Sequence, residues 1–245
     1  MIKIICLIPS LTETLIDCGV TVVGRTRYCL HPAPVVRGIP AIGGTKQVDW
    51  SVAKPLEPDL VILDREENTR EMADSCPFPH HAVHITSVHD VGAQLGELAQ
   101  LLGSSSLAEV AIRWDQVAAQ PRKNRQLAEL PGMLQWWRPP AGQTRAEYLI
   151  WRRPWMAIGQ GTFIYSMLAQ VGLTGRLSPH DEKYPEVQLS DLDPATTALL
   201  FSSEPYPFAR DREELLDLGF SCGLIDGESY SWYGTRSLRF LEELG

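Results

Sequence analysis

The chain has 245 residues and a formal net charge of −8 at pH 7. Hydrophobic residues make up 44% of it and charged residues 21%, which supplies enough apolar side chains for two hydrophobic cores. Acidic and basic residues are interspersed without a basic stripe, which argues against nucleic-acid binding. The five cysteines are scattered and form no Cys-x-x-Cys pair, so neither a disulfide framework nor a zinc knuckle is indicated.

No apolar run approaches the length of a membrane span, and Pro9 interrupts the short run at the start of the chain. We therefore expect a cytoplasmic protein without a membrane span. We also expect it to be a monomer. A periplasmic location would require a leader that has been removed.

The first half alternates strand and helix signals. Apolar runs predict strands at residues 2–8, 22–24, 60–63 and 82–85. Ser10, with Glu13 three residues later, has the form of a capping box, and Gly19 is expected to end that helix. A further helix is expected at about 91–102. This alternation predicts a mostly parallel sheet with helices on both faces.

Apolar side chains then recur at helical spacing from Leu107 to Ala118. We expect one long helix that carries the chain between two domains. The predicted division is an α/β lobe at 1–103, an interdomain helix at 104–122 and a second α/β lobe at 123–245.

The second half repeats the pattern of the first. Strands are expected at residues 147–151, 198–202 and 223–226. Thr162 is expected to cap a helix that runs to Gly172, and Asp211 with Glu214 has the form of a second capping box. A helix from about Thr235 is expected to finish the chain.

One sequence phrase occurs once in each half. The acid-Pro corners Glu57-Pro58-Asp59 and Asp193-Pro194-Ala195 each precede a buried strand. The duplication suggests two similar lobes with a ligand cleft between them. In such sheets the functional loops begin at the carboxyl ends of the strands.

Aromatic residues and arginines lie in or beside these loops. Aromatic side chains in loops favour contact with a large flat ligand, although they can also pack beneath their own loops. Arginines there suit the carboxylates or phosphates of a ligand, or remain solvated surface charges. The residues are Trp151, Trp155, Tyr206, Phe208, Tyr230, Trp232 and Tyr233, with Arg25, Arg27, Arg65, Arg152, Arg153 and Arg236.

Metal and catalytic signals are weak. His80, His81, His84 and His89 straddle an expected strand and would point to both of its faces, so no convergent metal site is expected. Cys29 and His31 are better placed for an axial contact to a metal complex. No Gly-x-Ser-x-Gly elbow or phosphate-binding Gly-x-x-x-x-Gly-Lys loop is present.

The order of the motifs resembles a known family, the periplasmic cobalamin-binding proteins. These are class III substrate-binding proteins for cobalamin, haem and iron-siderophores, within the helical backbone metal receptor superfamily. The resemblance covers nearly the whole chain. It runs through Ile8 to Leu15, Val23 to Pro32, Glu57 to Val61, Gly159 to Gly172, Tyr184 to Val187 and Ser229 to Arg236.

The resemblance implies an α/β fold of two Rossmann-like lobes with mostly parallel sheets, joined by a single long interdomain helix. It also implies that aromatic side chains of both lobes clasp the ligand. The matching positions are Tyr28, Tyr184, Trp232 and Tyr233. Lys46 and Arg65 fall near loop tryptophans of the cobalamin receptor, and this exchange favours an anionic ligand.

The family docks on an ABC permease through a glutamate on each lobe. The segment Gln47-Val48-Asp49-Trp50-Ser51 has no glutamate where the first is expected. The phrases at 149–156 and 203–208 resemble a leaderless branch of the class. A permease partner and a cytosolic carrier or sensor role both remain open.

We predict a non-enzymatic protein without a catalytic cofactor that binds a corrinoid, haem or iron chelate between its lobes. One alternative is a cytosolic enzyme that uses Glu204, His31 or Cys29 as acid–base or nucleophilic groups. Another is a protein-interaction module that uses the aromatic cleft. The predicted ligand contacts are Tyr28, Arg65, Arg152, Tyr184, Glu204, Trp232, Tyr233 and Arg236.

Overall fold

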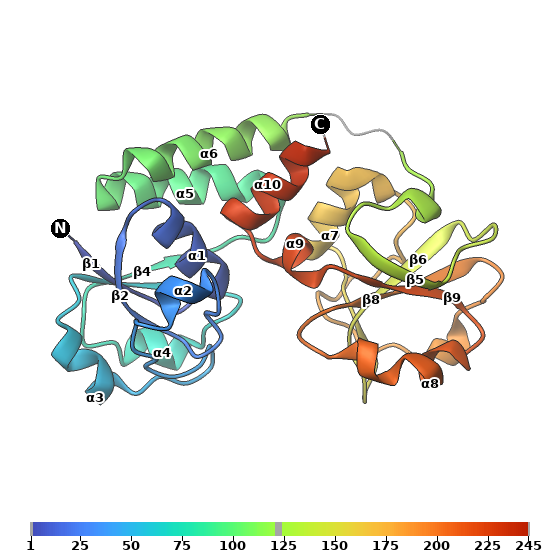
Figure 1. Ribbon diagram of the computed structural model, residues 1–245, viewed down its shortest axis with the longest axis horizontal. Helices are drawn as coiled ribbons and strands as arrows, with labels where there is room; N and C mark the ends of the chain where they lie inside the picture. Colours follow the sequence, from blue (N-terminus) through green and yellow to red (C-terminus); the bar gives the residue numbers. More distant parts are fainter. Residues whose placement is uncertain (1, 121–123, 245) are drawn as a thin grey trace. The chain divides into compact units, whose positions relative to one another are not determined.

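The computed structural model describes residues 2–120 and 124–244 and divides into two units (Figure 1). The first unit comprises the residues up to Ala119 together with Trp232–Arg239. The second comprises Gln120–Ser231 and the residues from Phe240 on. This division differs from the predicted one, since residues 104–119 of the expected interdomain helix and Trp232–Arg239 both belong to the first unit. The predicted end of the interdomain helix at residue 122 lies outside the described residues.

The first unit contains a four-stranded parallel sheet in the order β2-β1-β3-β4. Its strands are β1 (Lys3–Cys6), β2 (Thr21–Arg25), β3 (Leu60–Asp64) and β4 (His80–Val83). All four were predicted, although β4 begins two residues before the expected run. β3 lies inside the sheet and is buried along its whole length.

The first unit has six helices in its described residues up to Ala119, of which the first four connect the strands and the last two follow β4. They are α1 (Pro9–Asp17), α2 (Ala33–Val36), α3 (Trp50–Ala53), α4 (Arg70–Asp74), α5 (Val88–Leu102) and α6 (Ser105–Ala118), with a 3₁₀ turn, η1, at Lys54–Leu56. Figure 1 shows α5 and α6 side by side. Gly103, with a φ of 63°, ends α5, and the Ser104 hydroxyl caps α6, so the chain reverses within two residues.

The second unit contains a five-stranded sheet in the order β5-β9-β8-β6-β7. Its strands are β5 (Met133–Arg138), β6 (Arg145–Trp151), β7 (Met156–Ala157), β8 (Thr197–Ser202) and β9 (Ser221–Ile225). β6, β8 and β9 run parallel, as predicted. β5 and β7 run antiparallel at the two edges and were missed by the sequence analysis. Like β3, β8 lies inside its sheet and is buried throughout.

The helices of the second half are α7 (Phe163–Leu168), α8 (Arg212–Leu216), α9 (Gly227–Ser231) and α10 (Thr235–Glu243). Shorter turns lie at η2 (Leu127–Glu129), η3 (Ala169–Leu173), η4 (Leu189–Asp191) and η5 (Phe208–Asp211). The hydroxyl of Thr162 accepts a hydrogen bond from the Tyr165 amide at 3.2 Å, which confirms the predicted cap of α7. The helical path ends where Gly172 adopts a φ of 107°.

The two predicted capping boxes are wrong, because their acidic residues bind arginines instead. α1 begins without a side-chain cap, and Glu13 pairs with Arg236. α8 also lacks a side-chain cap, and Asp211 and Glu214 both bind Arg152. A guanidinium carries a full opposite charge and offers several donors in one plane, which a backbone amide does not.

We predict that Gly234→Ala destabilises the first unit. Gly234 has a φ of 111°, and a Cβ at this position would overlap with the Thr14 hydroxyl. We expect a loss of about 2–4 kcal/mol in the free energy of unfolding, measured by urea denaturation. Gly19→Ala is the matched control, since Gly19 also has a positive φ, of 73°, but open space around its Cα. Equal losses in the two variants would contradict the steric explanation.

Candidate functional site

The loop after β2 presents an exposed aromatic ring with a cation on it. Tyr28 is 49% exposed, and the guanidinium carbon of Arg27 lies 5.1 Å from the centre of its ring. A Cβ on Gly44 would lie 3.2 Å from both side chains, so a glycine there leaves room for this pair. Arg27 also lines a pocket of about 320 Å³ with Gly43, Gly44, Gln47, Val48, Asp49 and Trp50. The arrangement suits a flat ligand that carries an acidic group.

Arg65 directly follows β3 and is exposed. Its guanidinium makes no hydrogen bond or ion pair with any other described residue. It borders a pocket of about 440 Å³, together with Leu63, Asp64, Asn68, Thr69, Arg70, Ala73 and Ala82. Nearby on the same edge, the Lys46 ammonium donates to the Glu66 carbonyl at 3.3 Å. Arg65 is therefore a cation at a strand end that no carboxylate of the described residues neutralises.

Tyr233 is only 4% exposed, and its hydroxyl donates to Asp64 Oδ2 at 2.7 Å. Burial raises the pKa of Tyr233 well above its ordinary value and also raises the pKa of Asp64. The phenol is therefore protonated at neutral pH and acts as a donor to a buried carboxyl group. The structure thus places the predicted stacking residue Tyr233 in a buried hydrogen bond beside the start of the Arg65 loop.

Arg236 is held by a carboxylate of the protein. Its Nε and Nη2 donate to the two oxygens of Glu13 at 2.9 and 2.8 Å. The guanidinium also lies over the ring of Trp232 at 5.1 Å, and the His31 ring meets the same indole edge-on at 5.3 Å. The predicted site residues Arg236, Trp232 and His31 are thus engaged with side chains of their own unit.

Cys29 is buried, and its sulfur lies 3.2 Å from the hydroxyls of both Thr12 and Thr26. Burial raises the pKa of the Cys29 thiol, so the thiolate form needed for nucleophilic attack or metal ligation is disfavoured. Among the described residues, no three His, Cys, Asp or Glu side chains are grouped to hold a metal ion.

In the second unit, Arg152 is neutralised by two carboxylates. Its Nη1 and Nη2 lie 2.6 Å from Asp211 Oδ2 and Glu214 Oε2, respectively, and its guanidinium covers the Trp155 ring at 5.5 Å. Tyr206 also donates to Asp211 at 2.7 Å. The hydrogen bonds from Tyr206 and Arg152 lower the pKa of Asp211. This network fixes the loops after β6 and β8 to the start of α8.

The remaining predicted contacts differ in exposure. Glu204 is half-buried, and its Oε1 accepts a hydrogen bond from the Ser231 hydroxyl at 2.9 Å. Tyr184 is 44% exposed, in a segment whose Pro185 carbonyl accepts from the Ala157 amide at 3.0 Å. Tyr184 therefore stands on a segment that is tied to β7.

Two features missed by the sequence analysis shape this site. Arg27 was one arginine among several, and only the structure shows that it stacks on Tyr28. Asp64 lies one residue beyond the predicted strand at 60–63, whereas the structure shows that it ends β3 and is buried. The available signal for a buried Asp64 was its position directly after the unbroken apolar run at 60–63.

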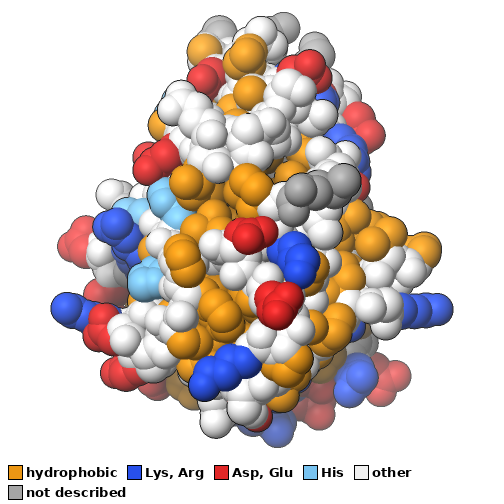
Figure 2. All heavy atoms as spheres, turned by 90° about the vertical axis from the view of Figure 1, so that its left-hand side faces the viewer, with side chains coloured by type: hydrophobic (Ala, Val, Ile, Leu, Met, Phe, Trp, Pro, Cys, Tyr) orange, Lys and Arg blue, Asp and Glu red, His pale blue; other side chains and the backbone are white. Residues whose placement is uncertain are grey.

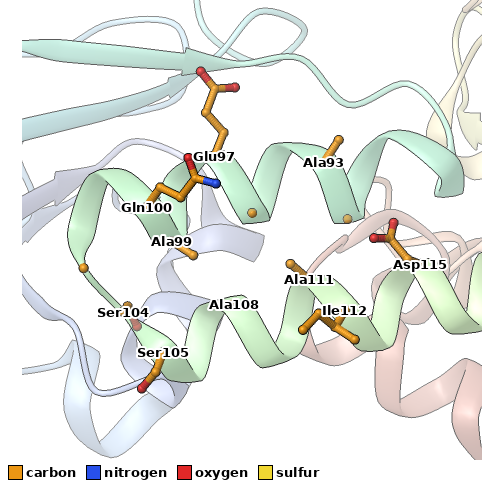
Figure 3. Close-up of a pocket in the computed structure, with 13 residues that line it drawn as sticks. Ala93, Glu97, Ala99, Gln100, Ser104, Ser105, Ala108, Ala111, Ile112 and Asp115 are labelled. Atoms are coloured by element: carbon orange, nitrogen blue, oxygen red, sulfur yellow. The ribbon is translucent and has the colours of Figure 1, made fainter.

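A further groove, of about 660 Å³, lies between α5 and α6 (Figure 3). Glu97 and Gln100 border it from α5, and Ile112 and Asp115 border it from α6. Most of its other lining residues are glycine, alanine or serine, which lets the two helices approach closely. None of the predicted site residues lines this groove.

The surface agrees with the composition. On the face shown in Figure 2, acidic and basic side chains are interspersed, and hydrophobic side chains are visible between them. None of the helices in the described part of the chain is long and apolar enough to cross a bilayer.

Comparison with solved structures defines the fold class. The chain is similar to the periplasmic vitamin B12-binding protein of Vibrio cholerae, with 15% identity, a TM-score of 0.67 and coverage of 99% of this chain and 94% of that one. It is also similar to a periplasmic haem-binding protein from Roseiflexus sp. RS-1, with 18% identity, a TM-score of 0.68 and coverage of 99% of this chain and 96% of that one. A periplasmic haem-binding protein from Pseudomonas aeruginosa matches with 16% identity, a TM-score of 0.72 and coverage of 99% of this chain and 90% of that one. No protein-family model and no curated protein matches the sequence.

The chain therefore has the fold of the class III substrate-binding proteins, which confirms the predicted fold class. At these identities the similarity defines the fold, and the ligand has to be argued from the residues.

We predict that the stability of the second unit falls as the pH drops below about 4, in part because of Asp211. Its pKa is lowered in the folded state, so its stabilising contribution is present above the unfolded pKa and is lost as the pH falls through the folded value. Asp211→Asn should weaken this dependence, measured as urea midpoints between pH 7 and pH 3. Asp217→Asn, at the exposed end of α8, should leave it unchanged. An identical pH profile for Asp211→Asn and the unmodified protein would refute the assignment.

Proposed function

We propose that the protein binds a metal-containing small molecule of the corrinoid, haem or iron-chelate class without transforming it. The observation that carries this proposal is the match of almost the whole chain to solved proteins described as vitamin B12-binding and haem-binding. The exposed ring of Tyr28, at the carboxyl edge of the first sheet, also supports it, because such a ring can stack on a flat ligand.

The distribution of charge favours a ligand with acidic groups. Arg152 and Arg236 are each held by carboxylates of the protein. Arg27 and Arg65 stand at the ends of β2 and β3 without such partners in the described structure. Haem, with two propionates, and ferric chelates with carboxylate arms offer acids for these two cations beside a surface that stacks on Tyr28.

Where the protein works is part of the same proposal. Delivery of the ligand to an ABC permease is supported by the similarity to a solved protein described as an ABC-transporter substrate-binding protein. A role as a cytosolic carrier or sensor of the same ligand is the alternative. The identity of the ligand is the first question that experiment has to answer.

Spectral titration tests the proposed function directly. We expect micromolar protein to shift the absorption spectrum of haem, of cobalamin or of a ferric siderophore, because ring stacking and desolvation change the environment of the chromophore. No shift with any of the three would exclude the proposal.

The charge argument has its own test. We expect Arg65→Ala to weaken the binding of an acidic ligand by about tenfold or more, as loss of a charge-assisted hydrogen bond costs roughly 1.5–3 kcal/mol. Arg176→Ala is the control, because the Arg176 carbonyl pairs with Ala146 near the opposite, amino-terminal end of β6. Equal effects of the two substitutions would indicate nonspecific attraction by net charge.

A further inference from the structure

The loop after β3 is organised around the carboxyl group of Asp64. Asp64 Oδ1 accepts hydrogen bonds from the backbone amides of Glu66 at 2.6 Å and Glu67 at 3.0 Å. The Arg65 amide donates to the Val83 carbonyl at 3.0 Å, which ties the start of the loop to β4. The backbone that carries Arg65 is therefore held on one side by β4 and on the other by the Asp64 carboxyl group.

Asn68 closes this loop. Its Oδ1 accepts from the Asp64 amide at 2.9 Å, and its Nδ2 donates to the carbonyls of Leu7 and Thr45 at 3.3 and 2.9 Å. The loop is thus joined to the end of β1 and to the loop after β2. A displacement of Asp64 would therefore disturb the hydrogen bonds that Asn68 makes to Leu7 and Thr45.

The second oxygen of Asp64 depends on Tyr233. Asp64 is 2% exposed, and a buried carboxyl oxygen without a partner is costly. The Tyr233 hydroxyl supplies the hydrogen bond at 2.7 Å across 169 residues of sequence.

Tyr233 is itself fixed by contacts that do not involve the loop. The neighbouring Gly234 carbonyl accepts from Trp114 Nε1 at 2.9 Å, and the Thr235 amide donates to Thr14 Oγ1 at 3.0 Å. These contacts hold Tyr233 against α1 and α6. Its hydroxyl is therefore a fixed point to which the loop is attached.

We propose that Tyr233 is a positioning residue that acts through Asp64 to orient Arg65 toward an acidic group of the ligand. The inference rests on the proposed function for the ligand. The geometry of the loop follows from the hydrogen bonds described above and does not depend on that function. Tyr233 then sets the preference of the site for acidic ligands without touching the ligand.

Hydrogen exchange on the ligand-free protein gives the first test. Tyr233→Phe removes only the hydroxyl, and we expect the amides of Glu66 and Glu67 to exchange about tenfold faster. The amides of β1 are the internal reference, since global destabilisation would accelerate them as well. Tyr230→Phe is the matched control: this buried tyrosine three residues earlier donates to the Pro131 carbonyl at 2.7 Å. Unchanged exchange at both loop amides in Tyr233→Phe would overturn the proposal.

Titration with haem gives the second test, in a double-mutant cycle of Tyr233→Phe and Arg65→Ala. We expect Tyr233→Phe to weaken haem binding by about five- to tenfold alone and by little when Arg65 is already replaced. Haem dimethyl ester, which lacks free carboxylates, should bind both forms equally. The same loss in the Arg65→Ala background would show a general structural effect and overturn the proposal. If the unmodified protein binds no haem, the proposed function fails for this ligand, and hydrogen exchange alone decides the role of Tyr233.

Discussion

Partly buried arginine–carboxylate pairs organise the loops on which the candidate site depends. In the first unit, Glu13 of α1 binds Arg236 through both oxygens. In the second, Asp211 and Glu214 share Arg152. Each pair joins segments that are far apart in sequence, so it converts flexible loop residues into a defined surface. A bidentate pair also fixes orientation, which a single hydrogen bond does not.

These pairs also decide which cations are left for a ligand. Arg152 and Arg236 were predicted to meet acidic groups of the ligand, but the protein already supplies those acids. Removing a partly buried arginine from its carboxylate would leave that carboxylate uncompensated, so a ligand would have to offset this cost before it gained anything. Arg27 and Arg65 carry no such cost. The anionic character of the proposed ligand therefore rests on these two residues.

Local patterns in the sequence predicted local structure well. Apolar runs predicted seven of the strands, and the predicted Thr162 cap was confirmed by the hydrogen bond that its hydroxyl accepts from the Tyr165 amide. The edge strands β5 and β7 were not predicted, because antiparallel edge strands lack a continuous run of buried residues. The same Ser/Asp-x-x-Glu spacing that predicts a capping box also places an acid within reach of a distant arginine. No local pattern distinguishes the two outcomes.

The return of Trp232–Arg239 to the first unit could not be predicted for the same reason. Periodicity identifies a helix from Thr235, but it does not say that the first residues of that helix, up to Arg239, belong to the first unit. An aromatic residue beside a glycine, as at Tyr233, is typical of a ligand-contacting turn when only its neighbours are considered. Its hydroxyl donates to Asp64, a buried carboxyl group that needs a donor from elsewhere in the chain. A buried acid at the end of an apolar strand therefore implies a distant polar partner, which for Asp64 is the hydroxyl of Tyr233.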